Sequence, residues 1–511
     1  GVINSDLAVI DLTTGYTYDG KPVAPSFWGN NASWATAGYF ARVNYDYDER
    51  YLFEANIRYD GSSRFRAENR WAWFPSVSAG WNIAKEPFWE SASRYVNTLK
   101  LRMSYGSLGN QNIGNWYPTY QKMGVYINNG AWLQDGKATD TAYSPELISS
   151  SLTWETIRSY NLGLDLGAFN NRLTSSFELY SRYTTNMIGP AQELPSVLGA
   201  SVPRTNNTDL RTYGFDFEVQ WKDNLDCGLF YGIRFILSDN QTEILRYPND
   251  SKLLMTNGIY SYYPGSHVGD FWGLKTLGIA KTDQEMKAHL ATIPHGGQSW
   301  LGTDWRAGDI MYADLDGNGV ISMESGTLAD HGDLIKLGND QPRFQFGLDL
   351  NASWKGFDMR VFFQGVGKRD FWPGYVAFWA SSNQNIWYML GFEEHLDYFR
   401  NTPSGDLDVN LDSYYPRPLL NAKNQYMQTK YLQDASYIRL KNFTFGYTIP
   451  QKYTQRIKVA NLRLFFTGEN LWTGTRLSSV FDPEGINGND KISGIGYPIM
   501  KTWACGLTIT L

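Results

Sequence analysis

The chain has 511 residues, a formal net charge of −6 and a mean hydropathy of −0.41. No stretch of the sequence approaches the roughly 18 consecutive apolar residues of a membrane-spanning helix, so a helical membrane protein is excluded. The negative net charge and the lack of a basic cluster argue against nucleic acid as a partner. Cys227 and Cys505 are the only cysteines, which excludes a disulfide framework.

Segments in which apolar and polar residues alternate recur along the chain, and this pattern is typical of β-strands with two unlike faces. In residues 51–60, for example, Phe53 and Ile57 share one side while Arg58 lies on the other. A soluble sandwich rarely sustains so many strands of this length. The pattern predicts thirteen strands, at residues 35–47, 51–60, 73–84, 98–107, 154–167, 171–184, 206–221, 226–240, 341–354, 356–367, 436–449, 460–471 and 499–511.

The last predicted strand indicates where such a sheet belongs. Trp503, Cys505, Leu507, Ile509 and Leu511 alternate with small or polar residues up to the end of the chain. An apolar edge strand makes a soluble protein aggregate, whereas a barrel in lipid needs one to close its ring of hydrogen bonds. Aromatic residues, 16% of the chain, suit the girdles that flank the apolar band of such a barrel.

We therefore expect an all-β fold, a transmembrane antiparallel β-barrel with a wet lumen. The apolar side of each strand should meet lipid and the polar side should line the lumen. Outward-facing residues should include Phe53, Ile57, Leu101, Phe346, Leu348, Leu507 and Ile509, and inward-facing ones Arg58, Arg102, Gln345 and Asp349.

The gaps between the predicted strands alternate between short and long. Outer-membrane barrels have short periplasmic turns and long extracellular loops. The long gaps, at about 108–153, 241–340, 368–435 and 472–498, should therefore share the extracellular end. On this topology residues 1–34 form an extracellular loop segment and residues 35–511 form the barrel portion. Since bacterial barrels have an even number of strands, strands 35–47 and 499–511 should pair with strands outside this sequence.

Several segments, taken in order, resemble those of SusC-type TonB-dependent transporters, the SusC/RagA family. They are residues 51–65 (YLFEANIRYDGSSRF), 73–81 (WFPSVSAGW), 99–110 (LKLRMSYGSLGN), 308–322 (GDIMYADLDGNGVIS), 338–367, 431–450 (YLQDASYIRLKNFTFGYTIP) and 465–472 (FFTGENLW). The resemblance implies a plugged barrel of 22 strands, of which this chain would form the C-terminal thirteen or so.

The resemblance also implies partners. A plug and a TonB box would precede these residues, so the TonB-ExbB-ExbD complex would act through an N-terminal region that this sequence lacks. A SusD-like surface lipoprotein would cover the mouth of the barrel. The surroundings would be outer-membrane lipid, in a Gram-negative bacterium of the Bacteroidota type.

The function that the resemblance implies is import of an oligomeric nutrient, with a glycan or oligosaccharide as the first expectation. Alternatives are an oligopeptide importer of the same family, or a siderophore or vitamin receptor that works without a lid. A secreted β-rich binding module or hydrolase is the alternative outside this class. The sequence contains none of the common catalytic motifs, and its five histidines lack ligand spacing, so we expect no enzyme.

One motif has the spacing of a calcium loop. Asp314, Asp316 and Asn318 place oxygens at the first, third and fifth positions, and a glycine follows. The carbonyl of Val320 would be a further ligand, and Glu324 would stand in for the acidic residue that the motif expects at the position of Ser325. The alternative is a turn held by hydrogen bonds of the Asp and Asn side chains. No cofactor is required, and structural calcium is the one ion we expect.

The long segment 368–435 is rich in aromatic residues. Their flat faces suit the C–H faces of sugar rings, and we expect substrate contact from at least one of them. The alternative is packing, because a long loop over a barrel mouth must bury apolar groups to stay ordered. The candidates are Trp372, Tyr375, Trp379, Trp387 and Tyr388.

Overall fold

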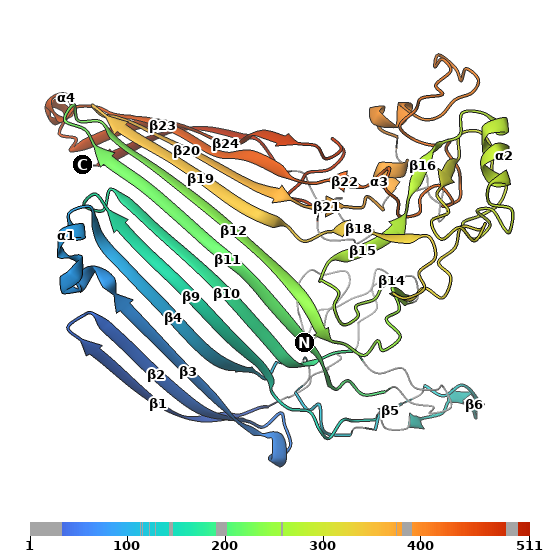
Figure 1. The fold of residues 1–511 in the computed structure, drawn as a ribbon, viewed down its shortest axis with the longest axis horizontal. Coiled ribbons are helices and arrows are strands. Elements are labelled where there is room, and N and C mark those ends of the chain that lie inside the picture. Colours follow the sequence, from blue (N-terminus) through green and yellow to red (C-terminus); the bar gives the residue numbers. More distant parts are fainter. Residues whose placement is uncertain are drawn as a thin grey trace, which may run out of the picture.

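The fold is that of a computed structural model, which describes residues 33–510 except 113, 115, 122, 128, 143–146, 191–201, 257–258, 375, 381–390 and 487–498. It contains one large antiparallel sheet of thirteen strands, in which each strand pairs with its neighbours in chain order (Figure 1). Its strands are β1 (Thr36–Tyr47), β2 (Tyr51–Ser62), β3 (Trp71–Asn82), β4 (Val96–Asn110), β9 (Glu155–Ala168), β10 (Leu173–Ile188), β11 (Asn206–Asn224), β12 (Phe230–Arg246), β19 (Arg343–Trp354), β20 (Phe357–Lys368), β23 (Tyr437–Thr448), β24 (Asn461–Thr475) and β25 (Thr502–Thr510).

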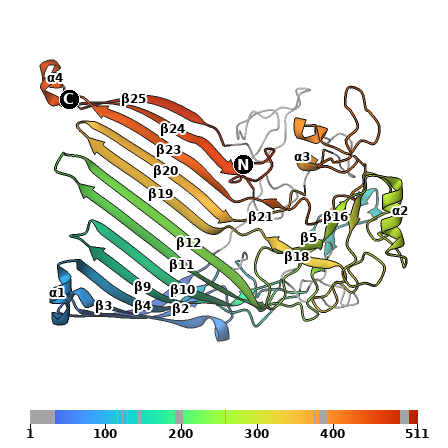
Figure 2. The ribbon, with the colours of Figure 1, turned by 45° about the horizontal axis from the view of Figure 1, so that its top comes forward.

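These strands are the thirteen that alternation predicts, and most of their bounds agree with the predicted ones within a few residues; the largest difference is in β12, predicted at 226–240 and observed at Phe230–Arg246. The turns after β1, β9, β11 and β19 lie at one end of the sheet, and the long connections after β4, β12, β20 and β24 begin at the other, as Figures 1 and 2 show. The turn that joins Trp354 to Phe357 lies at the end opposite α3 (Val376–Trp379), so the prediction that the four long loops share one end is confirmed.

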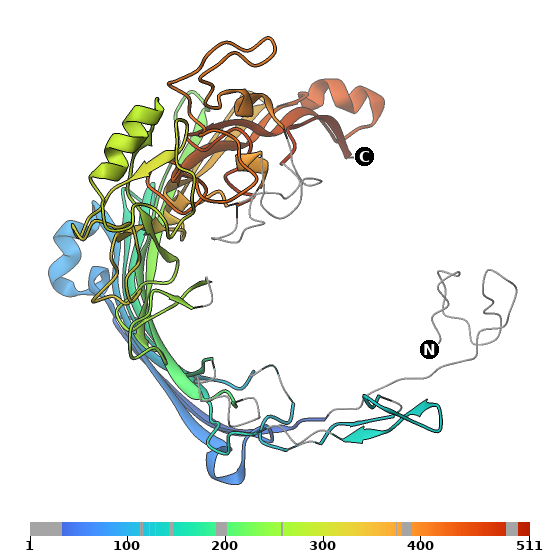
Figure 3. The same ribbon diagram turned by 90° about the vertical axis from the view of Figure 1, so that its right-hand side faces the viewer.

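Within the described residues, β1 pairs only with β2 and β25 only with β24. In Figure 3 the sheet forms an open arc with these two strands at its ends. The two strands do not pair with each other, and their pairing with strands outside this sequence stays a prediction. Each leaves one row of backbone groups without a partner in this sheet.

The two faces of the sheet differ in chemistry, as predicted. One face, here called the lumen face, carries Arg102 and Asp165, which pair across β4 and β9 with an Nε–Oδ2 distance of 2.7 Å. Register pairing continues this face across the sheet. Its further ion pairs are Arg42–Glu54, Arg58–Asp60, Arg234–Glu218, Arg360–Asp349 and Arg463–Asp358.

The opposite face, here called the outer face, is apolar over most of its height. The ladders place Leu101 opposite Leu164, and Phe346 opposite Leu237. Helix α1 (Glu90–Ser93) lies outside the arc in Figure 3. Just before it, Glu86 accepts hydrogen bonds from Tyr51 and Trp81, whose side chains belong to the outer face. The outer face is therefore the convex one.

Aromatic residues gather at two heights of the outer face. At the end with the short turns, Phe169 contacts Trp221, with ring centroids 6.1 Å apart. Toward the loop end, Tyr59 stacks on Trp73 with centroids 4.3 Å apart. Two girdles that flank an apolar band are typical of barrels in the outer membrane.

Strand β23 contains one extra residue, Lys441, where its register against β20 shifts. Leu440 and Phe443 therefore lie on the same face although an odd number of positions separates them. Such a bulge reverses the alternation of a strand. Here it keeps apolar side chains on the outer face both before and after Lys441.

The remaining elements lie in the loops and turns. The strands are β5 (Val125–Tyr126), β6 (Leu133–Gln134), β7 (Lys137–Ala138), β8 (Thr141–Ala142), β13 (Met255–Thr256), β14 (Ile259–Tyr260), β15 (Asp270–Leu274), β16 (Thr276–Ile279), β17 (Ile310–Tyr312), β18 (Leu334–Asn339), β21 (Asp370–Phe371) and β22 (Gln433–Asp434). The helices are α2 (Asp283–Ala291), α3 (Val376–Trp379), α4 (Gln451–Thr454) and the 3-10 turns at Ala67–Asn69, Ile83–Lys85, Pro87–Trp89, Glu393–Leu396 and Gln455–Ile457. Among the described residues no helix is both long and apolar enough to cross a membrane.

The long loops after β12, β20 and β24 pack together into one body, here called the loop unit. It comprises the described residues of 247–342, 369–436 and 476–486. Its buried core includes Leu274, Tyr312, Phe378 and Tyr431. The main apolar core of the described chain thus lies in the loops, not in the sheet.

Candidate functional site: the lumen wall and the loop unit

The lumen face carries a hollow of about 530 Å³ over its first strands. Arg102 is held there by Asp165, which also accepts a hydrogen bond from the Ser176 hydroxyl at 3.1 Å. Beside this pair, the Asn161 amide donates to the Ser104 hydroxyl at 3.0 Å. Guanidinium, carboxylate, amide and hydroxyl groups therefore line the hollow together. Such a wall can hydrogen-bond a hydrophilic solute while its charges compensate one another.

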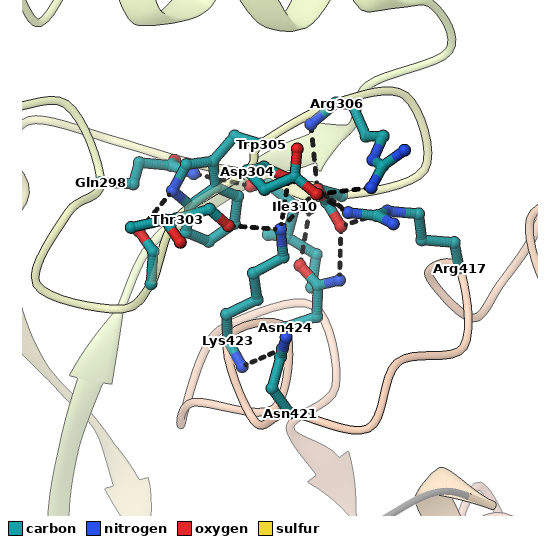
Figure 4. A network of polar contacts seen from close by, with 12 residues as sticks. Gln298, Thr303, Asp304, Trp305, Arg306, Ile310, Arg417, Asn421, Lys423 and Asn424 are labelled. Atoms are coloured by element: carbon teal, nitrogen blue, oxygen red, sulfur yellow. Dashed lines mark hydrogen bonds and ion pairs between the residues drawn. The ribbon is translucent and has the colours of Figure 1, made fainter. Parts of the chain in front are cut away.

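The loop unit is joined by a buried polar network centred on Asp309 (Figure 4). The Asp309 side chain is 0% exposed and accepts two hydrogen bonds from the Arg417 guanidinium, both at 2.8 Å. Lys423 approaches the same carboxylate at 2.9 Å, and the Asn424 amide donates to it at 2.9 Å. The network therefore ties the loop after β12 to the loop after β20.

Lys423 has further partners in the same network. Its Nζ donates to the carbonyls of Thr303 and Asp304 at 3.0 and 2.8 Å, and lies 4.5 Å from the ring centroid of Trp305. Burial lowers the pKa of Lys423, and the nearby Asp309 carboxylate opposes that effect. Burial would raise the pKa of Asp309, but the hydrogen bonds from Arg417, Asn424 and Lys423 outweigh it and hold the pKa below its ordinary value. The carboxylate stays charged because three donors compensate it.

The loop unit is also joined to the lumen wall. Arg439 of β23 donates to Asp482 at 2.8 Å and lies 3.1 Å from Glu484. The ammonium of Lys441 contacts Glu484 at 3.0 Å. The side chain of Arg439 is nearly buried, so this contact fixes the loop after β24 against the wall.

Two of the predicted substrate-binding residues lie inside the loop unit. Trp372 and Trp379 are 5% and 7% exposed, and their rings contact each other with centroids 5.9 Å apart. Trp379 also packs on Tyr431, with centroids 4.8 Å apart. Because both side chains are buried among other aromatic residues, these two positions fit packing, the alternative to substrate contact. Tyr375, Trp387 and Tyr388 lie outside the described residues.

The predicted calcium loop brings acidic side chains together, but not the predicted set. Carboxylate oxygens of Asp314, Asp316 and Asp333 lie within 4.8 Å of one another. Asn318 instead donates its amide to Glu324 at 2.6 Å, and its side-chain oxygen accepts from the Val320 N–H at 2.9 Å.

The carboxylates of this cluster also accept backbone N–H groups. Asp314 accepts from Gly317 and Gly319, as the alternative reading of a hydrogen-bonded turn predicts. Asp333 accepts from Leu315 at 2.6 Å and from Ser322 at 2.9 Å. Burial raises its pKa, the two N–H groups lower it, and the carboxylates of Asp316 and Asp314 raise it further. Three acidic groups whose charges repel suit a hard cation, and calcium would be held by oxygens of Asp314, Asp316 and Asp333.

Sequence reasoning missed two central residues of this region, Asp309 and Asp333. Each is an isolated Asp in a loop, and its partners come from distant positions, such as Arg417 for Asp309. The only local signal is that both lie just before an apolar strand of the loop unit, β17 or β18. That signal is too common to single them out.

A curved antiparallel wall with an apolar, girdled outer face and a polar lumen face defines a β-barrel protein of the outer-membrane type. Residues 4–471 match the family model described as TonB dependent receptor-like, beta-barrel. The chain therefore belongs to the TonB-dependent receptor β-barrel family, whose place is the outer membrane and whose members are transporters, not enzymes.

Named relatives agree with this assignment. TonB-dependent receptor P3 of Formosa agariphila is 29% identical over 503 residues, which are 92% of this chain and 45% of that protein. TonB-dependent receptor SusC of Bacteroides thetaiotaomicron is 27% identical over 477 residues, or 92% of this chain and 43% of that protein. This chain thus spans about half the length of these relatives.

Among solved structures, the fold is similar to that of the RagAB peptide transporter. The TM-score is 0.71 at 23% identity, covering 98% of this chain and 50% of the other. This likeness concerns the fold. It agrees with the predicted resemblance to the SusC/RagA family.

Proposed function

We propose that this chain forms the lumen wall and extracellular mouth of a TonB-dependent importer that takes up an oligosaccharide. The observation that carries the proposal is the lumen face, where arginines such as Arg102 are paired with carboxylates and where hydroxyl and amide groups such as Ser104 and Asn161 lie beside these pairs. Sugar hydroxyls both donate and accept hydrogen bonds, so they match such a wall without any net charge.

The same proposal includes partners outside the chain. The unpaired edges of β1 and β25 would each cost several kcal/mol per exposed backbone group in hydrocarbon, so further strands of a longer protein would complete the ring. A plug and a TonB box in that protein would couple it to the TonB-ExbB-ExbD complex. A SusD-like lipoprotein would cover the loop unit, in a bacterium of the Bacteroidota type, the group that the SusC and Formosa relatives suggest.

Peptide import is the second candidate, and the likeness of the fold to the RagAB peptide transporter favours it. A siderophore or vitamin receptor is a weaker alternative, because the hollow on the lumen face offers mixed charges, not a surplus of one sign.

The test is binding and uptake by the full-length protein together with the lipoprotein that co-purifies with it. Calorimetry should detect a neutral oligosaccharide from a panel of glycans, peptides and ferric siderophores. Asn161→Leu should weaken uptake, while Leu164→Ile on the outer face of the same strand should not. If only peptides bind, the protein is a peptide importer and the proposed oligosaccharide substrate is wrong. If substrate binds equally well without any lipoprotein, the proposed SusD-like lipoprotein cover is wrong.

A further inference from the structure

Most arginines of the sheet form an ion pair with a carboxylate, on the lumen face as in Arg102–Asp165 and on the outer face as in Arg343–Asp239. On the outer face, Arg158 of β9 and Arg211 of β11 have no carboxylate of the described residues within 4.0 Å. Both arginines pair in register with Tyr183 of β10, one from each side. Two guanidinium groups therefore flank one tyrosine, and on its other side Arg211 is opposite Glu243 of β12 in register, without an ion pair within 4.0 Å.

Aromatic rings hold Arg211 in place. Its guanidinium lies 5.0 Å from the ring centroid of Tyr213 and 5.5 Å from that of Tyr183, and its Nε donates to the Ser181 hydroxyl at 3.3 Å. These contacts use one of the five N–H groups of the Arg211 guanidinium, so the other four can donate to a ligand. A hollow of about 460 Å³ lies beside it, lined by Arg158, Tyr160, Ser181, Tyr183, Thr185 and Arg211.

A second hollow, of about 860 Å³, shares Tyr160, Ser181 and Arg211 with the first. It continues down the outer face toward the turn end, where its walls are apolar. Leu162, Leu179 and Phe215 are among the lining residues. The only further arginine in its lining, Arg343, is paired with Asp239 at 2.5 Å. The two hollows thus form one groove with a cationic head and an apolar tail, here called the outer groove.

The height of the outer groove follows from the strands. Tyr160 is nine positions from Phe169, a residue of the lower girdle. At about 3.3 Å per residue and a tilt of about 35–45°, this is about 21–24 Å along the barrel axis. The apolar band of a barrel is about 25 Å tall. Tyr160 therefore lies at the outer edge of the hydrocarbon, and Arg158 lies about 5 Å higher, at the level of the headgroups.

We propose that the outer groove is a binding site for an acylated lipid of the outer leaflet whose phosphate groups give it a net negative charge. Arg158 and Arg211 would bind the phosphate, since guanidinium is the side chain best suited to that group. The acyl chain would lie along Leu162 and Leu179. A free anion would leave the apolar tail of the groove exposed, and a zwitterionic lipid would bring no net negative charge to the two arginines.

The experiment uses the full-length protein purified in detergent. Its thermal midpoint is measured in micelles that contain lipid A, a phosphorylated and acylated glucosamine disaccharide. Parallel samples contain phosphatidylethanolamine or inorganic phosphate, and native mass spectrometry counts retained lipid. The variant is the pair Arg158→Gln and Arg211→Gln. The matched control is Arg182→Gln, which removes an arginine beside Tyr183 but on the lumen face.

Lipid A should raise the midpoint of the unchanged protein and of Arg182→Gln, and phosphatidylethanolamine or phosphate should not. In the double variant the rise and the retained lipid should be lost, while uptake of substrate persists. A double variant that keeps the full rise would overturn the proposal, as would an equal rise with phosphate alone. If the double variant fails to assemble, Leu179→Trp provides the test, because it fills the tail and should exclude the lipid with both arginines present. Since substrate uptake is measured separately, failure of this proposal leaves the proposed function untouched.

Discussion

The sheet and the loop unit are stabilised by different kinds of interaction. The sheet is a repetitive structure in which each strand needs only its neighbours and an alternation of side chains. The loop unit has little regular structure and relies on a buried core and a charged network around Asp309. The wall should therefore tolerate many single changes on its lumen face, whereas the loop unit should depend on a few buried groups.

Removal of Asp309 should give the largest effect. Asp309→Ala leaves Arg417 and Lys423 buried without their carboxylate, and breaking a buried ion pair costs about 3–5 kcal/mol. Limited proteolysis should then cut the loop unit while the barrel keeps its heat-modifiable mobility on gels. Asp412→Ala is the control, because its partner Lys281 is exposed and such pairs contribute at most about 1 kcal/mol. Equal proteolysis of the two variants would contradict the central role of Asp309.

A charge on the outer face should have the next largest effect. Leu164 lies five positions above Phe169, near the middle of the apolar band, so Leu164→Arg should cost about 2–4 kcal/mol. The yield of assembled barrel in the outer membrane measures this cost. Asn161→Arg puts the same charge on the lumen face of the same strand and should assemble normally. If both variants assemble equally well, the assignment of the two faces is wrong.

Calcium should stabilise one part of the loop unit and leave the wall unchanged. A weak extracellular site with a dissociation constant of about 10⁻⁴–10⁻³ M gives about 0.4–1.4 kcal/mol at about 1 mM calcium. Chelation should therefore increase cleavage near residues 312–334. Paired Asp314→Asn and Asp316→Asn changes should abolish the response, whereas Asp330→Asn, outside the cluster, should not. If chelation still increases cleavage in the variant with both changes, this segment is a hydrogen-bonded turn that does not bind calcium.

The smallest effect should be a two-part response to acid. Asp333 has a raised pKa, so its charge costs stability at neutral pH and this cost is relieved as the pH falls through the raised value toward 3.8. Asp309 has a lowered pKa, so its stabilisation is present above pH 3.8 and is lost as the pH falls through the lowered value. Fluorescence of Trp305, which contacts Lys423, should report loosening only in the second range. Loosening that begins above pH 3.8 would contradict the assignment to Asp309.

Prediction from sequence succeeded where structure is periodic. Residues such as Phe53 and Arg58 reveal their faces because neighbours two positions away repeat the pattern, so strand bounds and topology follow. The loop unit has no period. Asp309 meets Arg417, and Trp379 meets Tyr431, through contacts that only the folded loops create. The calcium motif was found by its local spacing, but Asp333 was missed because it comes from outside that spacing.

The extra residue in β23 has a consequence for how this wall can change in length. Deleting Lys441 would make Leu440 and Asn442 adjacent, and because these two already lie on opposite faces, both halves of the strand would keep their faces. Arg439 would keep its contact with Glu484 on the lumen face, and Phe443 and Phe445 would stay on the outer face. A strand of this wall can therefore lose or gain residues in pairs, but a single deletion keeps the two faces only where it removes an extra residue such as Lys441. The loops obey no such parity, so variation in their length is free to reshape the mouth while the wall stays constant.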